Sequence, residues 1–147
     1  QGVERRFDVH INTPKITYID DYAHHPRELS SAISSIRNIF PGRKITAIFQ
    51  PHLYTRTRDF AAEFAQSLSM LDELILLDIY PARELPIEGV TSEIIFKDVA
   101  AGKKTLMKKE EVLDFLKEKE LDILITFGAG DIDRLIVPIE TMLNGRL

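Results

Sequence analysis

The sequence has 147 residues, of which 44% are apolar and 29% charged, values typical of one globular domain and not of a disordered or fibrous chain. Its 23 acidic and 19 basic residues give a net charge of −4, which argues against a nucleic-acid binder that relies on a basic surface. Cysteine is absent and no apolar run approaches roughly 20 residues, which excludes disulfides, thiolate metal sites and a membrane-spanning helix.

Short apolar runs alternate with amphipathic stretches along the whole chain. Runs of apolar residues predict strands, and apolar residues at three- and four-residue steps predict helices. In chain order, these patterns predict a strand at Phe7–Ile11, a strand at Lys15–Asp20, a helix at Pro26–Phe40, a strand at Lys44–Phe49, a helix at Arg58–Leu71, a strand at Glu73–Ile79, a helix at Ser92–Ala100, a strand at Thr105–Lys108, a helix at Glu110–Glu118, a strand at Leu121–Phe127 and a helix at Ile132–Leu143, bent or interrupted at Pro138.

This alternation predicts an α/β fold with a mostly parallel sheet and helices on both faces. In such folds, ligands bind at the loops that follow the carboxyl ends of the strands. Polar residues gather in four of these loops, at Asp20–His25, Gln50–Arg58, Tyr80–Glu84 and Gly128–Asp131. We therefore expect the functional site at one edge of the sheet.

The first of these loops contains two adjacent carboxylates and two adjacent imidazoles, Asp20, Asp21, His24 and His25. Both residue types are metal ligands, so one interpretation is a metal site, and with it a metal-dependent hydrolase. The spacing is poor for that purpose, because neighbouring residues of an extended chain point to opposite sides. The alternative is structural, with an aspartate capping a turn and His25 capping the following helix.

The second loop, Gln50–Arg58, carries two arginines, a histidine and two threonines, and leads into a helix. Arginine presents a planar fork that matches a carboxylate or phosphate. Thr55, Thr57 and free backbone amides at the start of the following helix would favour the same anion. We expect Arg56 and His52 to contact an anionic ligand.

The segment Gly128–Gly130 matches only half of a dinucleotide-binding fingerprint, and its glycines are equally expected in a tight strand-to-helix turn. The chain contains no P-loop for ATP and no serine-centred nucleophile elbow.

Three segments in order resemble the C-terminal domain of the bacterial Mur ligases. They are Gly2–Phe7, DDYAHHP at 20–26 and FQPHLYTRTRDF at 49–60, and the segments Asp78–Glu84 and Gly128–Ile132 fit the same pattern. The resemblance covers nearly the whole chain and is closest to the members that attach L-alanine to UDP-N-acetylmuramate. It implies that residues 1–147 are one Rossmann-like, three-layer domain. The N-terminal UDP-binding domain and the central P-loop ATPase domain of a cytoplasmic three-domain enzyme are then absent from this sequence, which also begins without methionine.

The resemblance implies ATP-dependent amide formation in peptidoglycan precursor synthesis. The carboxylate of UDP-N-acetylmuramate is phosphorylated by ATP, and the amine of L-alanine attacks the acyl phosphate, releasing phosphate after ADP. Magnesium ions assist in the full-length enzyme, and no metal site is expected in this domain. Because each binding site is only half built here, we expect the isolated domain to fold but to have no ligase activity.

Residue by residue, the resemblance implies nucleotide binding by Arg6, Asp21, Tyr22 and His24, and binding of the amino acid's carboxylate by His52 and Arg56. No catalytic residue is expected within this domain alone. Two positions depart from the family pattern: Leu53 stands where relatives carry arginine, and Arg83 where relatives often carry glycine.

Two further functions remain open from the sequence besides the metal-dependent hydrolase. One is the related ligase that recycles cell-wall tripeptide onto UDP-N-acetylmuramate, which shares the DDYAHHP-type loop. The other is a non-catalytic Rossmann-like module that binds an anionic ligand or a partner protein at the same edge of the sheet.

Overall fold

A six-stranded sheet forms the middle layer of the molecule, which is described by a computed structural model over residues 7–147. The strands are β1 (Asp8–Asn12), β2 (Thr17–Asp21), β3 (Ile45–Phe49), β4 (Glu73–Leu76), β5 (Lys103–Leu106) and β6 (Ile123–Phe127). Their order across the sheet is β1-β2-β6-β3-β4-β5, with β1 antiparallel to β2 and the other pairs parallel. The mostly parallel sheet predicted from the sequence is confirmed.

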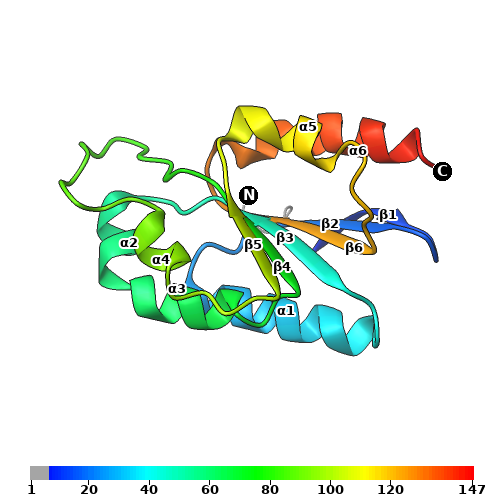
Figure 1. The fold of residues 1–147 in the computed structure, drawn as a ribbon, viewed down its shortest axis with the longest axis horizontal. Coiled ribbons are helices and arrows are strands. Elements are labelled where there is room, and N and C mark those ends of the chain that lie inside the picture. The colour runs from blue at the N-terminus through cyan, green and yellow to red at the C-terminus, as the bar shows by residue number, and fades with distance from the viewer. Residues whose placement is uncertain (1–6) are drawn as a thin grey trace.

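Helices cover both faces of this sheet, as Figure 1 shows, so the predicted three layers are also confirmed. The α-helices are α1 (Pro26–Ile39), α2 (Tyr54–Asp59), α3 (Ala61–Leu68), α4 (Glu93–Phe96), α5 (Val112–Leu116) and α6 (Ile136–Asn144). Two 3₁₀ helices, η2 (Lys109–Glu111) and η3 (Asp131–Leu135), precede α5 and α6. Helices α1, α3 and α4 lie on one face, and α5 and α6 lie on the other (Figure 1).

The strand side chains alternate between two apolar cores, because successive residues of a strand point to opposite faces. Ile19 of β2 and Phe49 of β3 pack with α1 and α3, whereas Tyr18 and Ile48 pack with α5 and α6. All five residues of β2, β3 and β6 are buried. These three strands therefore form the rigid centre from which the loops of the site emerge.

Several predicted helices differ from the structure. The helix predicted at Ser92–Ala100 is only the four residues of α4, and those predicted at Glu110–Glu118 and Ile132–Leu143 each begin as a 3₁₀ helix. The predicted helix at Arg58–Leu71 is two helices, which begin at Tyr54 and break at Phe60, where the backbone has a non-helical φ of −122°. The second half of the loop expected at Gln50–Arg58 is therefore helical. The helix predicted at Ile132–Leu143 is interrupted before Pro138 and not at it: it changes from 3₁₀ to α after Leu135. Helix α6 continues through Pro138, its third residue, because the missing N–H lies in a first turn that has no intrahelical acceptor.

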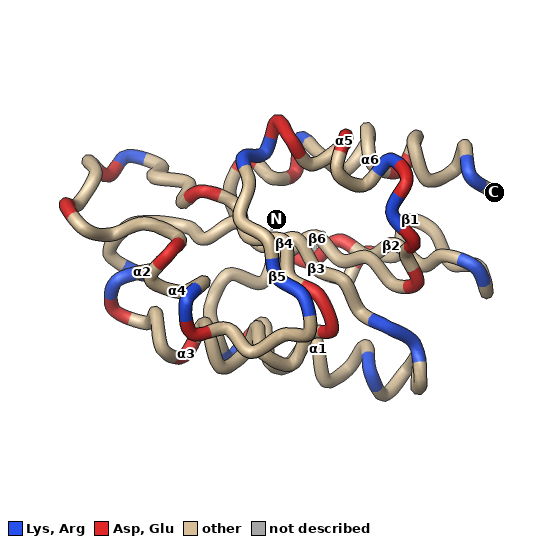
Figure 2. Tube along the Cα trace, viewed as in Figure 1, with Lys and Arg blue, Asp and Glu red and all other residues tan. Residues whose placement is uncertain are grey.

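Acidic and basic residues are interspersed along the chain trace (Figure 2). Within residues 7–147, no helix combines the length and the apolar character needed to cross a membrane.

Candidate functional site at the carboxyl edge of the sheet

The carboxyl ends of β2, β6, β3 and β4 meet at one edge of the sheet, and the loops that follow them are tied together by backbone hydrogen bonds. The N–H of Gly128 donates to the carbonyl of Asp21 (3.3 Å), and the N–H of Gln50 donates to that of Phe127 (3.1 Å). The N–H of Leu77 donates to the carbonyl of Phe49 (3.0 Å). The predicted convergence of the polar loops on one edge is thus confirmed.

The two adjacent aspartates at the end of β2 are buried and serve the fold. Asp20 accepts a hydrogen bond from the hydroxyl of Thr126 on β6 (2.7 Å). Asp21, on the other face, accepts from the backbone N–H of Ala23 (2.8 Å) and of Phe7 (3.0 Å). The structural interpretation, in which an aspartate caps the turn, is confirmed for Asp21. Arg6, which directly precedes Phe7 in the sequence, lies outside the described residues.

His24 and His25 follow on the loop into α1, and Glu28 fixes both of their backbones. Its carboxylate accepts from the N–H of His24 (3.0 Å) and from that of His25 (3.1 Å), which is the N-cap residue of α1. The Nδ1 atom of His24 lies 3.0 Å from the carbonyl oxygen of Tyr22. Within residues 7–147, no three His, Asp or Glu side chains are grouped so that they could hold a metal ion. The four residues of the hydrolase alternative are therefore not assembled as a metal centre.

Four rings from three loops form a continuous row along this edge, here called the ring row: Tyr22, His24, His52 and Tyr80. Tyr22 meets His24 edge-on with ring centroids 5.2 Å apart, and His24 meets His52 edge-on at 5.8 Å. Tyr80 stacks on His52 at 5.7 Å with an interplanar angle of 14°. The structure thus brings Tyr22 and His24, two of the residues predicted for the nucleotide, next to His52, one of those predicted for the amino acid.

Arg56, in α2, points back toward the ring row. Its guanidinium donates to Nδ1 of His52 over 3.2 Å, so the neutral imidazole carries its proton on Nε2. Burial lowers the pKa of His52, and the electrostatic influence of Arg56 and His24 lowers it further, opposed by Glu84. The predicted pair, His52 and Arg56, is therefore one hydrogen-bonded unit that presents a guanidinium beside a neutral imidazole.

Tyr80 was not predicted as a site residue, although it lies in one of the four loops noted in the sequence. Besides stacking on His52, its backbone N–H donates to the carbonyl of Pro51 and its carbonyl accepts from the N–H of Leu53, both over 2.8 Å. This short parallel bridge sets the orientation of the His52 backbone. The only sequence signal was its place after a buried strand.

The donors at the start of α2 are already engaged within the chain, contrary to the expectation that they would hold an external anion. Glu84 accepts from the N–H groups of Tyr54 (2.6 Å) and Thr55 (3.1 Å) and from the hydroxyl of Thr55 (2.5 Å). The buried hydroxyl of Thr57 donates to the carbonyl of Leu53 (2.8 Å). The position of Glu84, 29 residues away from Thr55, could not be read from local sequence.

The glycine turn after β6 is shaped by close packing. A Cβ atom on Gly130 would lie 2.6 Å from both the ring of Tyr80 and the side-chain oxygen of Gln50. Gln50 in turn accepts from the N–H of Ile132 (3.0 Å) and donates to Asp131 (2.7 Å). The turn therefore packs directly against the ring row, and its glycines make the close approach possible.

A sequence profile described as Mur ligase, glutamate ligase domain, matches residues 5–130, which is most of the chain. The chain belongs to the Mur ligase family. A relative from Parabacteroides distasonis, called UDP-N-acetylmuramate–L-alanine ligase, is 58% identical over 142 residues, which are 97% of this chain and 31% of the relative. A protein of the same name from Phocaeicola vulgatus is 54% identical over 98% of this chain and 32% of its own length. The chain thus spans about a third of these curated relatives.

Solved Mur ligase structures share the fold of this domain. A murein peptide ligase from Psychrobacter arcticus superimposes with a TM-score of 0.74 at 17% identity, over 95% of this chain and 30% of that one. A domain from a putative UDP-N-acetylmuramate tripeptide ligase of Haemophilus ducreyi gives 0.68 at 21% identity, over 94% of this chain and 99% of that one. At these identities the likeness shows the fold alone.

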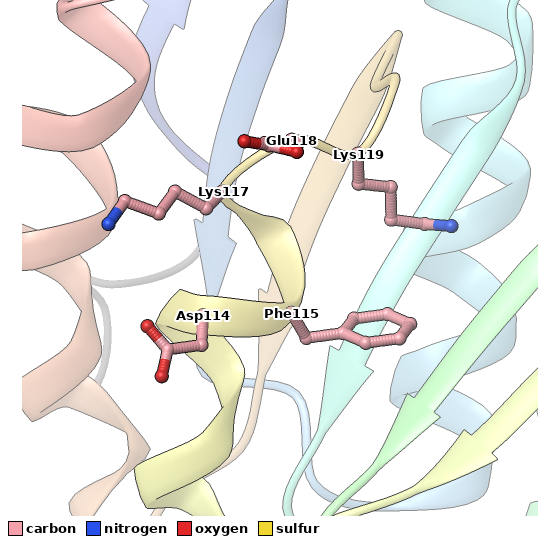
Figure 3. Close-up of a pocket in the computed structure, with 5 residues that line it drawn as sticks. All are labelled: Asp114, Phe115, Lys117, Glu118 and Lys119. Atoms are coloured by element: carbon pink, nitrogen blue, oxygen red, sulfur yellow. The ribbon is translucent and has the colours of Figure 1, made fainter.

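Among residues 7–147, two surface hollows are relevant to the position of the site. One, of about 540 Å³, lies beside the ring row and is lined by His25, Pro26, Arg27, Glu28, Phe60 and Glu63. The other, of about 490 Å³, surrounds the end of α5 and is lined by Asp114, Phe115, Lys117, Glu118 and Lys119. In Figure 3 these side chains point in different directions rather than toward one another. The residues that line this second hollow come just before the start of β6. They therefore lie at the amino edge of the parallel strands, opposite the edge that carries the site.

The histidines of the site predict a pH-dependent stability. Burial lowers the pKa of both His25 and His52, and the electrostatic influence of Arg56 and His24 lowers both further. Below pH 6.5 the unfolded chain then binds more protons than the folded one, so stability falls as the pH falls. We expect the urea-unfolding free energy to decrease as the pH falls from 7.5 to 5.5.

The matched variant is the double substitution His25→Gln and His52→Gln, which keeps an acceptor for Arg56. It is expected to flatten this pH dependence when both proteins are compared with their own stability at pH 8. Equal slopes for the two proteins would contradict the assignment.

Proposed function

We propose that residues 1–147 are the C-terminal domain of an ATP-dependent ligase that joins L-alanine to UDP-N-acetylmuramate in the cytoplasm, as a step of peptidoglycan precursor synthesis. The observation that carries this proposal is the 58% identity, over 97% of the chain, to a relative with that name. An N-terminal UDP-binding domain and a central ATPase domain would complete the enzyme, consistent with the 31% of that relative which this chain spans.

The His52–Arg56 pair is the proposed site for the carboxylate of L-alanine. A guanidinium carries five N–H donors, and the 3.2 Å contact uses one of its nitrogens to hold His52. The remaining donors can bind a carboxylate in the bidentate manner that arginine favours. Holding the carboxylate aims the amine of L-alanine at the activated carbonyl, so the contribution to catalysis is positioning.

Arg6, Asp21, Tyr22 and His24 form the proposed nucleotide side of the site. Tyr22 and His24 offer ring surfaces at the end of β2, and Asp21 fixes the turn that carries them through its bond to Ala23. Solved relatives of this fold include MurF ligase from Thermotoga maritima in complex with ADP and a folylpolyglutamate synthase complexed with AMPPNP and manganese. ATP would supply the phosphoryl group that activates the muramyl carboxylate.

Magnesium is assigned to the full-length enzyme and not to this domain. The described residues contain no cluster of three acidic or histidine side chains to hold it.

The test is phosphate release by the full-length protein with ATP, Mg²⁺ and UDP-N-acetylmuramate, with L-alanine or cell-wall tripeptide as the amine. Release that requires L-alanine supports the proposal. Release that requires the tripeptide would instead identify the recycling ligase. If no phosphate is released with either amine and this chain alone binds an anion, the non-catalytic module is favoured.

A further inference from the structure

Glu84 has no part in the function proposed above, yet its carboxylate organises the start of α2. It lies in the loop between β4 and α4 and accepts three hydrogen bonds, from the N–H groups of Tyr54 and Thr55 and from the hydroxyl of Thr55. Bonds to an ionised acceptor are stronger than neutral ones. The hydroxyl of Thr55 lowers the pKa of Glu84, as do the two backbone amides, in spite of the opposing effect of burial. The carboxylate therefore stays charged and directed at α2.

The turn that Glu84 holds is strained. Leu53, the N-cap residue of α2, has a φ of +76° and a ψ of 136°, a conformation that side-chain-bearing residues rarely adopt. Such strain persists only where the surroundings over-determine it. Here the backbone of Tyr80 holds Pro51 and Leu53, and Glu84 holds Tyr54 and Thr55.

The two residues of the proposed carboxylate site flank this clamped turn. His52 directly precedes the strained Leu53, and Arg56 directly follows Thr55. Their 3.2 Å hydrogen bond closes over the turn. A rotation of the first turn of α2 would therefore move Arg56 relative to His52.

We propose that Glu84 is a positioning residue for the amino-acid carboxylate: by capping α2 from a different loop, it sets the place where Arg56 meets His52. This inference rests on the proposed function.

The experiment is steady-state kinetics of the full-length ligase with Glu84→Ala, Glu84→Gln and, as a matched control, Glu88→Ala. Glu88 is an exposed carboxylate in the same loop. We expect Glu84→Ala to raise KM for L-alanine about tenfold, the size of a lost charged cap, with KM for ATP and for UDP-N-acetylmuramate changed less than about twofold. Glu84→Gln keeps an oxygen acceptor for the two amides and should raise KM for L-alanine about threefold.

A purely structural role would lower the melting temperature or the active fraction and leave KM for L-alanine unchanged, and that result overturns the proposal. If Glu84→Ala does not fold, Glu84→Gln and Thr55→Val, which removes only the hydroxyl donor, carry the same test. An unchanged KM for L-alanine in both of them overturns the proposal as well.

A second readout separates this inference from the proposed function, since it needs no activity. In the 147-residue chain, the pKa of the His52 ring is measured by NMR titration. Loss of the negative charge of Glu84 alone would lower this pKa, whereas movement of Arg56 away from His52 would raise it toward 6.5. We expect a rise for Glu84→Ala, and a fall overturns the positioning role. Failure of the wild-type full-length protein to use L-alanine would instead overturn the proposed function.

Discussion

Replacing Arg56 by alanine in the full-length ligase is expected to raise KM for L-alanine by about 10- to 100-fold. The substitution removes the guanidinium that lies 3.2 Å from His52 and is proposed to hold the substrate carboxylate. Hydrogen bonds to charged groups contribute about 1.5–3 kcal/mol, which corresponds to this range. The measurement is phosphate release as a function of L-alanine concentration, at saturating ATP and UDP-N-acetylmuramate.

Arg58 provides the matched control, because it lies in the same helix but is exposed and paired with Asp59 over 2.8 Å. Arg58→Ala should leave KM for L-alanine within about twofold of wild type, as is usual for exposed ion pairs. If Arg56→Ala leaves the dependence on L-alanine untouched, the carboxylate site is not at this pair.

The purified 147-residue chain is expected to release no phosphate from ATP, even with UDP-N-acetylmuramate and L-alanine present. The sequence has no P-loop to hold the triphosphate, and this domain is proposed to provide only part of the nucleotide site and part of the amino-acid site. Catalysis by positioning needs both reacting groups held in place, so without the rest of these sites nearly all of the rate is lost. The expected affinity of the chain for ATP or L-alanine alone is weak, measured by calorimetric titration.

The control is the full-length protein at the same molar concentration, which should turn over under identical conditions. Urea unfolding of the 147-residue chain shows in parallel that it is folded, as expected from the two apolar cores that enclose its sheet. Turnover by the folded chain alone would contradict the proposal that the chemistry belongs to further domains of a longer protein.

The position of the site follows from strand order. Strand β6, the last strand in the sequence, lies between β2 and β3 and pairs with both. The turn at Gly128 therefore lies between the loop that follows β2 and the Gln50–Arg58 segment that follows β3. Ligands of open α/β sheets bind where the strand order reverses in this manner. The central position of β6 also brings Gly130 against the ring of Tyr80, so the glycine turn packs against one end of the ring row.

The strands, the helices and the edge that carries the site could be predicted from the sequence because they depend on local patterns. Burial repeats every second residue in a strand and at three- or four-residue steps in a helix, and both periods can be read directly. The motifs around Asp21, His24, His52 and Arg56 also indicated the family. Helix ends were less predictable: α2 starts four residues before the predicted helix, because Leu53 adopts a strained conformation that no local preference favours.

Only the tertiary structure decided which groups of the site are available to a ligand. The sequence alone determined that Thr55 and the amides of α2 are anion donors, but Glu84, 29 residues away, occupies them. It likewise placed Tyr80 in a neighbouring loop without its stacking on His52. Periodicity records which residues are buried and says nothing of which loops meet, because that depends on strand order and on side-chain contacts between segments far apart in the chain.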